Sequence, residues 1–209
     1  MAPIQQLFDA ICGGDRNSVE SIIKSSLDEG VNPSELLNDS MIPAMREMGK
    51  RFSRHEAYVP DMLIAARAMQ TGLDIVEPLL TQKGHKPLGK ICIGTVKGDL
   101  HDIGKNLVAI MLKGAGFEVM DLGVNCEVEK FDAAVGEGAD AVLCSALLTT
   151  TMPYMKTVVD HFKDNPAVKV LVGGAPVTRD YAEEIGADGF GRDANEAVTA
   201  VEQALASTG

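Results

Sequence analysis

Residues 90–106, KICIGTVKGDLHDIGKN, contain the pattern from which the fold can be predicted. A short apolar run opens it, a glycine-containing loop follows, and a helical pattern begins at its end. A buried strand that leads through a loop into a helix is the first half of a βαβ unit, in which the strands pair in parallel. The loop carries Asp99 two residues before His101, at the point where the helix starts.

The rest of the chain towards the C-terminus repeats this rhythm. Amphipathic segments separate four further short apolar runs, which are FEVMDLG (117–123), DAVLCSAL (140–147), VKVLVGG (168–174) and ADGFG (187–191). Five such strands predict an α/β fold with a flavodoxin-like (Rossmann-like), doubly wound parallel sheet of strand order 2-1-3-4-5. Ligands of such sheets bind beyond the carboxyl ends of the strands, so the loops that follow the five runs should form the site.

The residues before this stretch follow a helical period instead. Apolar residues recur three and four positions apart in four segments, which end near Gly13, near Gly30, at Phe52 and at Leu79. Asn32 followed by Pro33 marks the start of the third segment. The spacing of Met41, Met45 and Met48 is that of a buried helix face. Four helices with short turns predict an N-terminal four-helix bundle.

A polar segment separates the two patterns. KGHKPLG, residues 83–89, contains glycine and proline and has neither period. We therefore predict a helical cap domain over residues 1–82, a linker over 83–89 and an α/β domain over 90–209.

Composition excludes several classes of function. The chain has 30 acidic and 19 basic residues and a formal charge of -11, which disfavours binding to nucleic acid or anionic membranes. No apolar run approaches the roughly 20 residues that cross a bilayer. The N-terminal residues do not form a secretory signal, so we expect a cytoplasmic protein.

The four cysteines do not form a sequence motif. Cys12, Cys92, Cys126 and Cys144 lie far apart, without the CxxC pairs of zinc or dithiol sites. We expect reduced, mostly buried thiols. The alternative for Cys144 is a thiol close to a redox cofactor.

The Asp99 and His101 pair can hold a metal or move a proton. A carboxylate on one imidazole nitrogen leaves the other nitrogen free as a base or as a metal ligand. The other histidines, His55, His85 and His161, do not cluster with this pair in the sequence. A single protein ligand points to a metal whose other positions are filled by a macrocycle.

Three spaced motifs resemble those of the cobalamin-binding domains. They are DxHxxG at Asp99, His101 and Gly104, SxL at Ser145 and Leu147, and GG at Gly173 and Gly174. The segment MGKRFSRHEAYVPDMLIAARAM resembles the helical cap of the same family. The chain is most similar to the stand-alone corrinoid proteins of methylamine, methanol, glycine betaine and methoxy-aromatic methyltransferase systems, and to the corresponding module of methionine synthase.

This resemblance implies a cofactor and a set of ligands. The cofactor would be cobalamin or a related corrinoid (methylcobalamin, cob(I)alamin or cob(II)alamin), bound base-off with His101 as the lower ligand of cobalt. Asp99 would back the imidazole, and Thr151, six residues past Ser145, would extend this relay, as a hydroxyl at this position does in methionine synthase. The remaining cofactor contacts implied are Asp102, Ile103, Gly104, Ser145, Leu147, Thr149, Gly173, Gly174, and Tyr58 or Met62 as the shield of the upper face.

Several of these residues also have structural interpretations. Gly173 and Gly174 could form only a tight turn, and Tyr58 could only staple its helix to a neighbour. Asp193 could be the N-cap of the last helix rather than a cofactor contact.

The implied function is that of a methyl carrier and not of a complete enzyme. One methyltransferase would methylate the corrinoid, a second would pass the methyl group to tetrahydrofolate or a thiol, and a reductive activase would rescue oxidised cobalt. The alternative is the cobalamin-binding subunit of an adenosylcobalamin-dependent mutase, although small mutase subunits lack a cap. A response-regulator receiver would need an aspartate at the end of the third strand, where this chain has CSALL.

Overall fold

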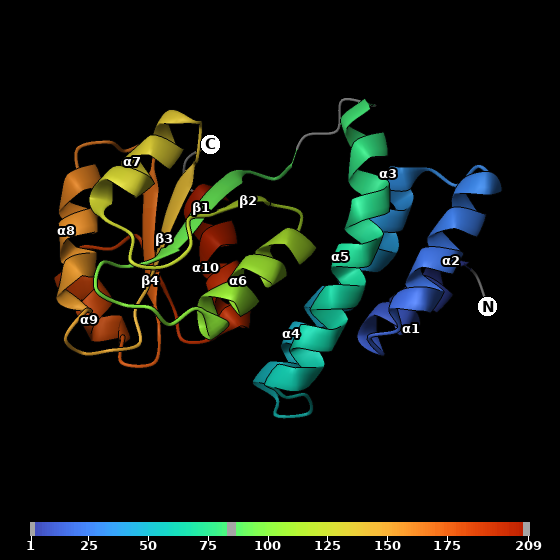
Figure 1. Cartoon of the computed structure of the whole chain (residues 1–209), viewed down its shortest axis with the longest axis horizontal. Coiled ribbons are helices and arrows are strands. Elements are labelled where there is room, and N and C mark those ends of the chain that lie inside the picture. Colours follow the sequence, from blue (N-terminus) through green and yellow to red (C-terminus); the bar gives the residue numbers. More distant parts are fainter. Residues whose placement is uncertain (1–2, 83–86, 207–209) are drawn as a thin grey trace. The chain divides into compact units, whose positions relative to one another are not determined.

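The computed structural model describes residues 3–82 and 87–206, which form two compact units (Figure 1). The first unit contains the helices of residues 3–82, and the second contains the sheet and most of the residues after 87. Most of the predicted linker, residues 83–86, lies outside the described residues. None of the helices in the described part is long and apolar enough to cross a membrane.

The first unit is a bundle of four helical segments, as predicted. Their parts are α1 (Pro3–Cys12), α2 (Arg16–Asp28), a continuous run of α3 (Pro33–Leu36), the π-helical turn η1 (Leu37–Met41) and α4 (Ile42–Ser53), and finally α5 (Val59–Gln82). Asn32 caps the third segment as expected, because its side chain accepts a hydrogen bond from the backbone of Ser34. Met41, Met45 and Met48 are buried, which confirms that the methionine stripe is core.

The π-helical turn was not predicted, and a proline explains its position. Pro43 has no N–H to give to the carbonyl four residues earlier, so the regular ladder is interrupted there. Just before it, the N–H of Ile42 donates to the carbonyl of Leu37, five residues back. The wider π-helical turn contains one more residue than an α-helical turn, and the helix continues through Pro43.

The turn between α4 and α5 holds a strained residue. His55 has a φ of 59°, in the left-handed region that costs a residue with a side chain about 1 kcal/mol. His55→Gly is therefore expected to raise the free energy of unfolding of the apoprotein by about 0.5 kcal/mol, since glycine adopts this φ freely but loses more chain entropy on folding. Chemical denaturation measures the change. The control is His55→Ala, which keeps the strain; an equal gain in both variants would contradict this account.

The second unit is a five-stranded parallel sheet in the predicted order β2-β1-β3-β4-β5. The strands are β1 (Lys90–Thr95), β2 (Glu118–Asp121), β3 (Ala141–Ser145), β4 (Lys169–Gly173) and β5 (Gly189–Gly191). The register sets the strand ends side by side, because Thr95 pairs with Ser145 and Ser145 with Gly173. The loops that follow β1, β3 and β4 therefore begin side by side, at the carboxyl ends of the strands.

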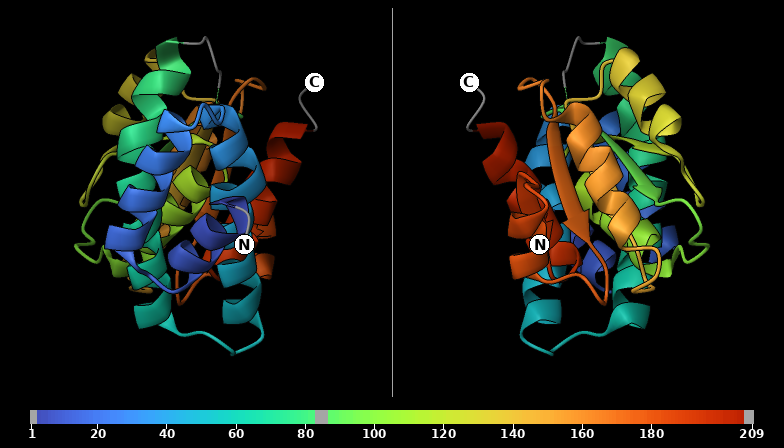
Figure 2. Two further views of the ribbon diagram at one scale, coloured as in Figure 1. Left: turned by 90° about the vertical axis from the view of Figure 1, so that its right-hand side faces the viewer. Right: turned by 90° about the vertical axis from the view of Figure 1, so that its left-hand side faces the viewer.

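Helices cover both faces of this sheet, as a doubly wound fold requires. On one face lie α7 (Val128–Gly136), α8 (Pro153–Phe162) and α9 (Arg179–Glu184), and on the other lie α6 (Ile103–Gly114) and α10 (Ala194–Ala206) (Figure 1). The right-hand view of Figure 2 shows α8 alongside β4. Phe131, Met155 and Val158 anchor the buried core under α7 and α8.

The same core contains three of the four cysteines, all of them free thiols. Cys92, Cys126 and Cys144 are buried in it, whereas Cys12 in α1 is partly exposed. Burial raises the pKa of Cys92 to about 12 and that of Cys12 to about 11, and it also raises the pKa of Cys144. Thiols that stay protonated at neutral pH are poor nucleophiles and poor ligands. The expectation of free, mostly buried thiols is confirmed, because Cys92, Cys126 and Cys144 are unpaired and buried.

Candidate functional site

The carboxylate of Asp99 lies at the centre of the loops beyond the strand ends. Its residue is fully buried, whereas the side chain of His101 is 51% exposed. Asp99 Oδ1 accepts a hydrogen bond from the backbone N–H of His101 at 3.0 Å and lies 2.7 Å from His101 Nδ1. An ionised carboxylate only accepts, so Nδ1 carries the ring proton. The lone pair of the imidazole is therefore on Nε2, which has no partner among the described residues.

The second oxygen of Asp99 binds the loop that follows β3. Asp99 Oδ2 accepts hydrogen bonds from the N–H groups of Leu147 (2.8 Å) and Leu148 (3.3 Å) and from Thr151 Oγ1 (2.7 Å). The threonine hydroxyl lies 3.0 Å from the carbonyl of Leu148 as well. Asp99 thus ties the histidine loop to a loop about fifty residues later, and the residue proposed as the third member of the relay is in hydrogen-bond contact with it.

These bonds keep Asp99 ionised. Burial alone would raise the pKa of its carboxyl group, but the hydrogen bonds from the Leu147 and His101 N–H groups, from Thr151 and from the His101 ring outweigh that cost. Together they hold the pKa of Asp99 well below its ordinary value. The aspartate is therefore a fixed anion that orients the imidazole.

The start of α6 carries the next predicted residues. Asp102 accepts hydrogen bonds from the backbone N–H of Asn106 (2.7 Å, to its carbonyl) and from the Asn106 side chain (3.2 Å, to Oδ2). Asp102 therefore stabilises the first turn of this helix, whatever else it binds. Ile103 and Gly104 follow it and are exposed.

Lys105 is a buried residue of this region that the sequence reasoning missed. Its ammonium group donates to Asn106 Oδ1 at 2.6 Å and to Asp121 Oδ1 at 2.5 Å, and its side chain is almost completely buried. The ion pair connects α6 to the end of β2. The available signal was a lysine within the apolar period of this helix, together with an aspartate at the end of the second apolar run.

Exposed apolar side chains lie on the two loops that Asp99 connects. Leu100 and Ile103 are 72% and 70% exposed on either side of His101 in the chain, and Leu147 and Leu148 are more than 40% exposed. The last two are the residues whose N–H groups bind Asp99. Apolar side chains exposed together usually mark a binding surface. Ile103 and Leu147 were predicted to contact the cofactor, whereas Leu100 and Leu148 were not.

The predicted glycines fall into two groups. A Cβ on Gly104 would meet nothing within 4 Å, so this position borders open space. A Cβ on Gly174 would lie 1.9 Å from the carbonyl oxygen of Ala146, and one on Gly173 would lie 2.9 Å from that of Gly191. The close approach of neighbouring loops therefore already explains Gly173 and Gly174.

The other predicted residues of the second unit lie at strand ends, in loops or at a helix start. Ser145 ends β3 and is partly exposed, and its hydroxyl makes no hydrogen bond within residues 3–82 and 87–206. It is thus available to a ligand. Thr149 is exposed in the loop beyond it. Asp193 caps α10, because its Oδ1 accepts a hydrogen bond from the N–H of Glu196 at 2.8 Å, as its structural interpretation had it.

Tyr58 and Met62 belong to the helical unit. Tyr58 precedes α5, where its N–H donates to Asp61 Oδ2 at 2.8 Å, and its side chain is 64% exposed. Met62, one turn into the helix, is buried. Of the two residues predicted as a shield, only the tyrosine presents its side chain at the surface.

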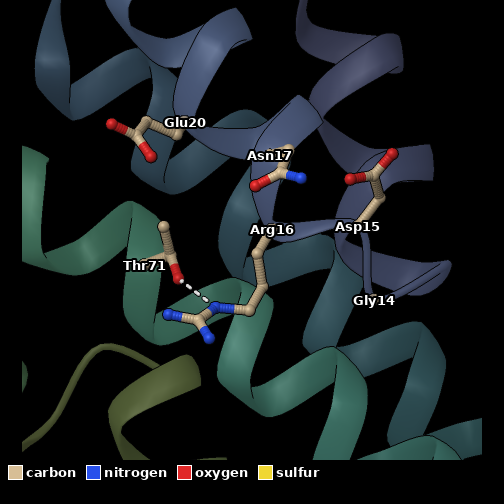
Figure 3. Close-up of a pocket in the computed structure, with 6 residues that line it drawn as sticks. All are labelled: Gly14, Asp15, Arg16, Asn17, Glu20 and Thr71. Carbon is tan, nitrogen blue, oxygen red and sulfur yellow. Dashed lines mark hydrogen bonds between the residues drawn. The ribbon is translucent and has the colours of Figure 1, made fainter.

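A polar hollow elsewhere on the helical unit contains none of the predicted residues (Figure 3). Its lining is Gly14, Asp15, Arg16, Asn17, Glu20 and Thr71. Arg16 Nε donates to Thr71 Oγ1 at 3.1 Å, and the carboxylate of Asp15 caps α2. Arg16 and Asp15 therefore already make hydrogen bonds that stabilise the helical bundle.

The geometry of the strand-end loops fits a cobalt macrocycle. The described residues contain no group of three or more histidine, cysteine or acidic side chains that could hold a bare metal ion. A single imidazole, fixed through Nδ1 and open at Nε2, suits a metal whose equatorial ligands belong to a ring. The exposed leucine and isoleucine side chains suit the apolar rim of such a ring.

Comparison with known families agrees with this geometry. Residues 89–199 match a family described as the B12 binding domain, and residues 3–77 match a second family with the same description. The chain belongs to the B12-binding domain family. Its cofactor is accordingly cobalamin or a related corrinoid.

Individual members of the B12-binding family resemble the whole chain. A corrinoid protein of Desulfitobacterium hafniense is 38% identical over 205 residues, which cover 95% of each chain. The trimethylamine corrinoid protein of Methanosarcina barkeri is 39% identical over 208 residues, covering 97% of this chain and 96% of that protein. Among solved structures, the methanol:cobalamin methyltransferase complex MtaBC of Methanosarcina barkeri matches with a TM-score of 0.86 and 27% identity, over 98% of this chain and 80% of that one.

Proposed function

We propose that this chain carries a methyl group on the cobalt of a corrinoid between two methyltransferases. The relatives support the role, because they are named as corrinoid proteins of methylamine systems and as part of a methanol:cobalamin methyltransferase complex. The observation that carries the proposal is the His101 imidazole, which Asp99 holds in the loop beyond β1 and whose Nε2 has no partner within residues 3–82 and 87–206.

In this proposal the corrinoid is base-off and His101 is its lower ligand. The cobalt would accept a methyl group from one protein and give it up to another. The chain's own residues hold the ring in place. Asp99 orients the imidazole and keeps its proton on Nδ1, while Leu147, Leu148 and Thr151 keep Asp99 ionised and immobile. The exposed Leu100 and Ile103 exclude water beside the ligand.

The helical unit has a separate part in the proposal. Residues 1–82 would act as a cap, in which the exposed Tyr58 shields the upper face of the corrinoid. A face that is shielded cannot be reached by a methyltransferase in the same pose, so cap and cofactor domain must adopt at least two arrangements during turnover. The partners we propose are a corrinoid-methylating methyltransferase, a second methyltransferase to tetrahydrofolate or a thiol, and a reductive activase, all in the cytoplasm.

Coordination by His101 is tested by electron paramagnetic resonance of the cobalt(II) form of the loaded protein. Nitrogen-14 splits the cobalt lines into triplets, and nitrogen-15 splits them into doublets. With only the histidines labelled with nitrogen-15, we expect doublets. Triplets would mean that the base of the cofactor still binds cobalt and would refute base-off, histidine-on binding.

His101→Ala is expected to abolish the label-dependent doublets and to weaken corrinoid binding by about tenfold to a hundredfold, because the rest of the site is intact. Titration of the apoprotein with corrinoid measures the affinity. The matched control is His161→Ala: this imidazole is also exposed and also pairs with an aspartate, Asp132, at 2.9 Å, but it lies on α8. Loss of the signal in both variants would argue against a specific role for His101.

The carrier role is tested by turnover. The loaded chain alone should show no sustained methyl transfer, since its one strong constellation of polar groups is used to hold the cofactor. Activity should appear when a cognate corrinoid-methylating methyltransferase is added, and it should be lost in His101→Ala. Steady multiple turnover by the chain alone would refute the carrier role.

A further inference from the structure

The loop between β2 and α7 contains a residue in an unusual conformation. Asn125 has a φ of 51° and, within residues 87–206, is the one residue other than glycine with a positive φ. Asparagine tolerates this region better than most residues, yet it is still strained there. Strained backbone persists where the surrounding structure holds it, often beside functional sites.

Asn125 makes two hydrogen bonds to the segment that precedes His101. Its backbone N–H donates to the carbonyl of Asp99 at 3.0 Å, and its Oδ1 accepts from the N–H of Gly98 at 2.8 Å. Gly98 itself has a φ of 82°. The left-handed conformation of Asn125 thus directs its backbone donor and its side-chain acceptor to the same two residues.

The loop that carries Asn125 is itself fixed to β1. The N–H of Cys126 donates to the carbonyl of Thr95 at 2.8 Å, and the N–H of Thr95 donates to the carbonyl of Gly123 at 3.0 Å. The buried hydroxyl of Thr95 then donates to the carbonyl of His101 at 2.8 Å. The histidine loop is therefore held at Gly98 and Asp99 by one neighbour and at His101 by another.

We propose that Asn125 is a positioning residue for the cobalt ligand, acting through Gly98 and Asp99. The inference rests on the proposed function, in which His101 Nε2 binds cobalt. The Asp99 carboxylate can orient the imidazole only while its own backbone is immobile, and Asn125 supplies the bonds that fix this backbone from outside the DxHxxG motif. Partners that orient a metal ligand typically change metal affinity tenfold to a hundredfold when removed.

Two substitutions separate the side-chain bond from the backbone conformation. Asn125→Gly adopts the same φ and keeps the N–H to Asp99, but it removes the acceptor for Gly98. Asn125→Asp keeps an acceptor oxygen at the same position and also tolerates the left-handed region. The control is Asn165→Gly, since Asn165 is exposed in the turn between α8 and β4, at the amino ends of the strands and away from the loops of the site.

The experiment uses the full chain in two forms. In the apoprotein, hydrogen exchange of the Gly98 amide should accelerate in Asn125→Gly and stay near wild type in Asn125→Asp and Asn165→Gly. In the form loaded with cob(II)alamin and labelled with nitrogen-15 histidine, Asn125→Gly should reduce the histidine-coordinated fraction and weaken corrinoid affinity about tenfold, and Asn125→Asp should restore both.

The outcomes distinguish this inference from the function on which it rests. Faster Gly98 exchange with an unchanged cobalt spectrum and unchanged affinity would overturn the positioning role and leave His101 as the ligand. If the wild-type spectrum shows no doublets from the labelled histidine, the proposed function is refuted, and the positioning role of Asn125 is refuted with it. Failure of Asn125→Asp to restore the spectrum would also overturn the role that we assign to the acceptor oxygen.

Discussion

Asp99→Asn is expected to remove histidine coordination while preserving the shape of the site. Every group around the carboxylate is a donor: two N–H groups and the Thr151 hydroxyl face Oδ2, while the N–H and ring of His101 face Oδ1. An amide has only one oxygen, so one side must meet an NH2 group. If the NH2 group faces the ring, Nδ1 becomes the acceptor and the ring proton moves to Nε2, where it blocks the ligand position.

The same substitution should destabilise the apoprotein by about 2–4 kcal/mol, because buried donors lose a charged acceptor. The effect depends on pH with a definite sign. The pKa of Asp99 is lowered in the folded state, so its contribution is fully present above the unfolded pKa of about 3.9 and is lost as the pH falls below that value. Wild type should therefore lose stability relative to Asp99→Asn below about pH 4.

Denaturant midpoints between pH 3 and pH 7, together with the cobalt(II) spectrum, measure both effects. The control is Asp160→Asn, which changes an exposed aspartate of α8 that pairs with Lys156. A variant of Asp99 with wild-type stability at pH 7 and intact doublets would show that the carboxylate neither holds the two loops nor orients the imidazole.

Among glycine-to-alanine substitutions in the second unit, Gly174→Ala is expected to lower the free energy of unfolding the most. The new Cβ would lie 1.9 Å from the carbonyl oxygen of Ala146, and the φ of Gly174 is 134°, which alanine does not adopt without strain. The obstacle is backbone and not a flexible side chain, so the loops after β3 and β4 would have to separate. We expect a loss of at least about 4 kcal/mol, measured by chemical denaturation of the apoprotein and as a lower soluble yield.

Gly104→Ala is the matched control, because its Cβ would enter open space at the start of α6. The apoprotein should be unchanged or more stable by about 0.5 kcal/mol, since alanine favours the helix. Corrinoid affinity should fall nevertheless if this space receives the cofactor. Equal destabilisation by both alanines would contradict the distinction drawn between the two glycines.

The sequence predicted the sheet and its order because five short apolar runs alternate with helical patterns, and such a pattern has few solutions. It also indicated that Asp99 and His101 interact, since they are two residues apart. Pairs that the fold brings together were harder to predict. The N–H groups of Leu147 and Leu148 that bind Asp99, and the buried ion pair of Lys105 with Asp121, are set by loop geometry that no local period encodes.

The glycine motif shows a different limit of sequence reasoning. Gly173 and Gly174 stand where a family motif expects them, but a motif cannot say whether the missing side chain leaves room for a ligand or for the chain itself. In this structure the carbonyls of Gly191 and Ala146 lie so close that a side chain at Gly173 or Gly174 would collide with the chain itself. Asn125 was missed because only its φ, and not its residue type, distinguishes it from an ordinary loop asparagine.

The bond between Thr151 and Asp99 has a consequence for the order of events during synthesis. The two residues are 52 positions apart, and the pairing of β3 with β1 brings the loop after β3 beside the aspartate. A contact of this range carries a loop-closure cost that is offset only when the intervening chain is ordered. His101, the proposed cobalt ligand, emerges from the ribosome well before the residues that hold Asp99, so a nascent chain that ends before Thr151 should not capture corrinoid in the histidine-on state.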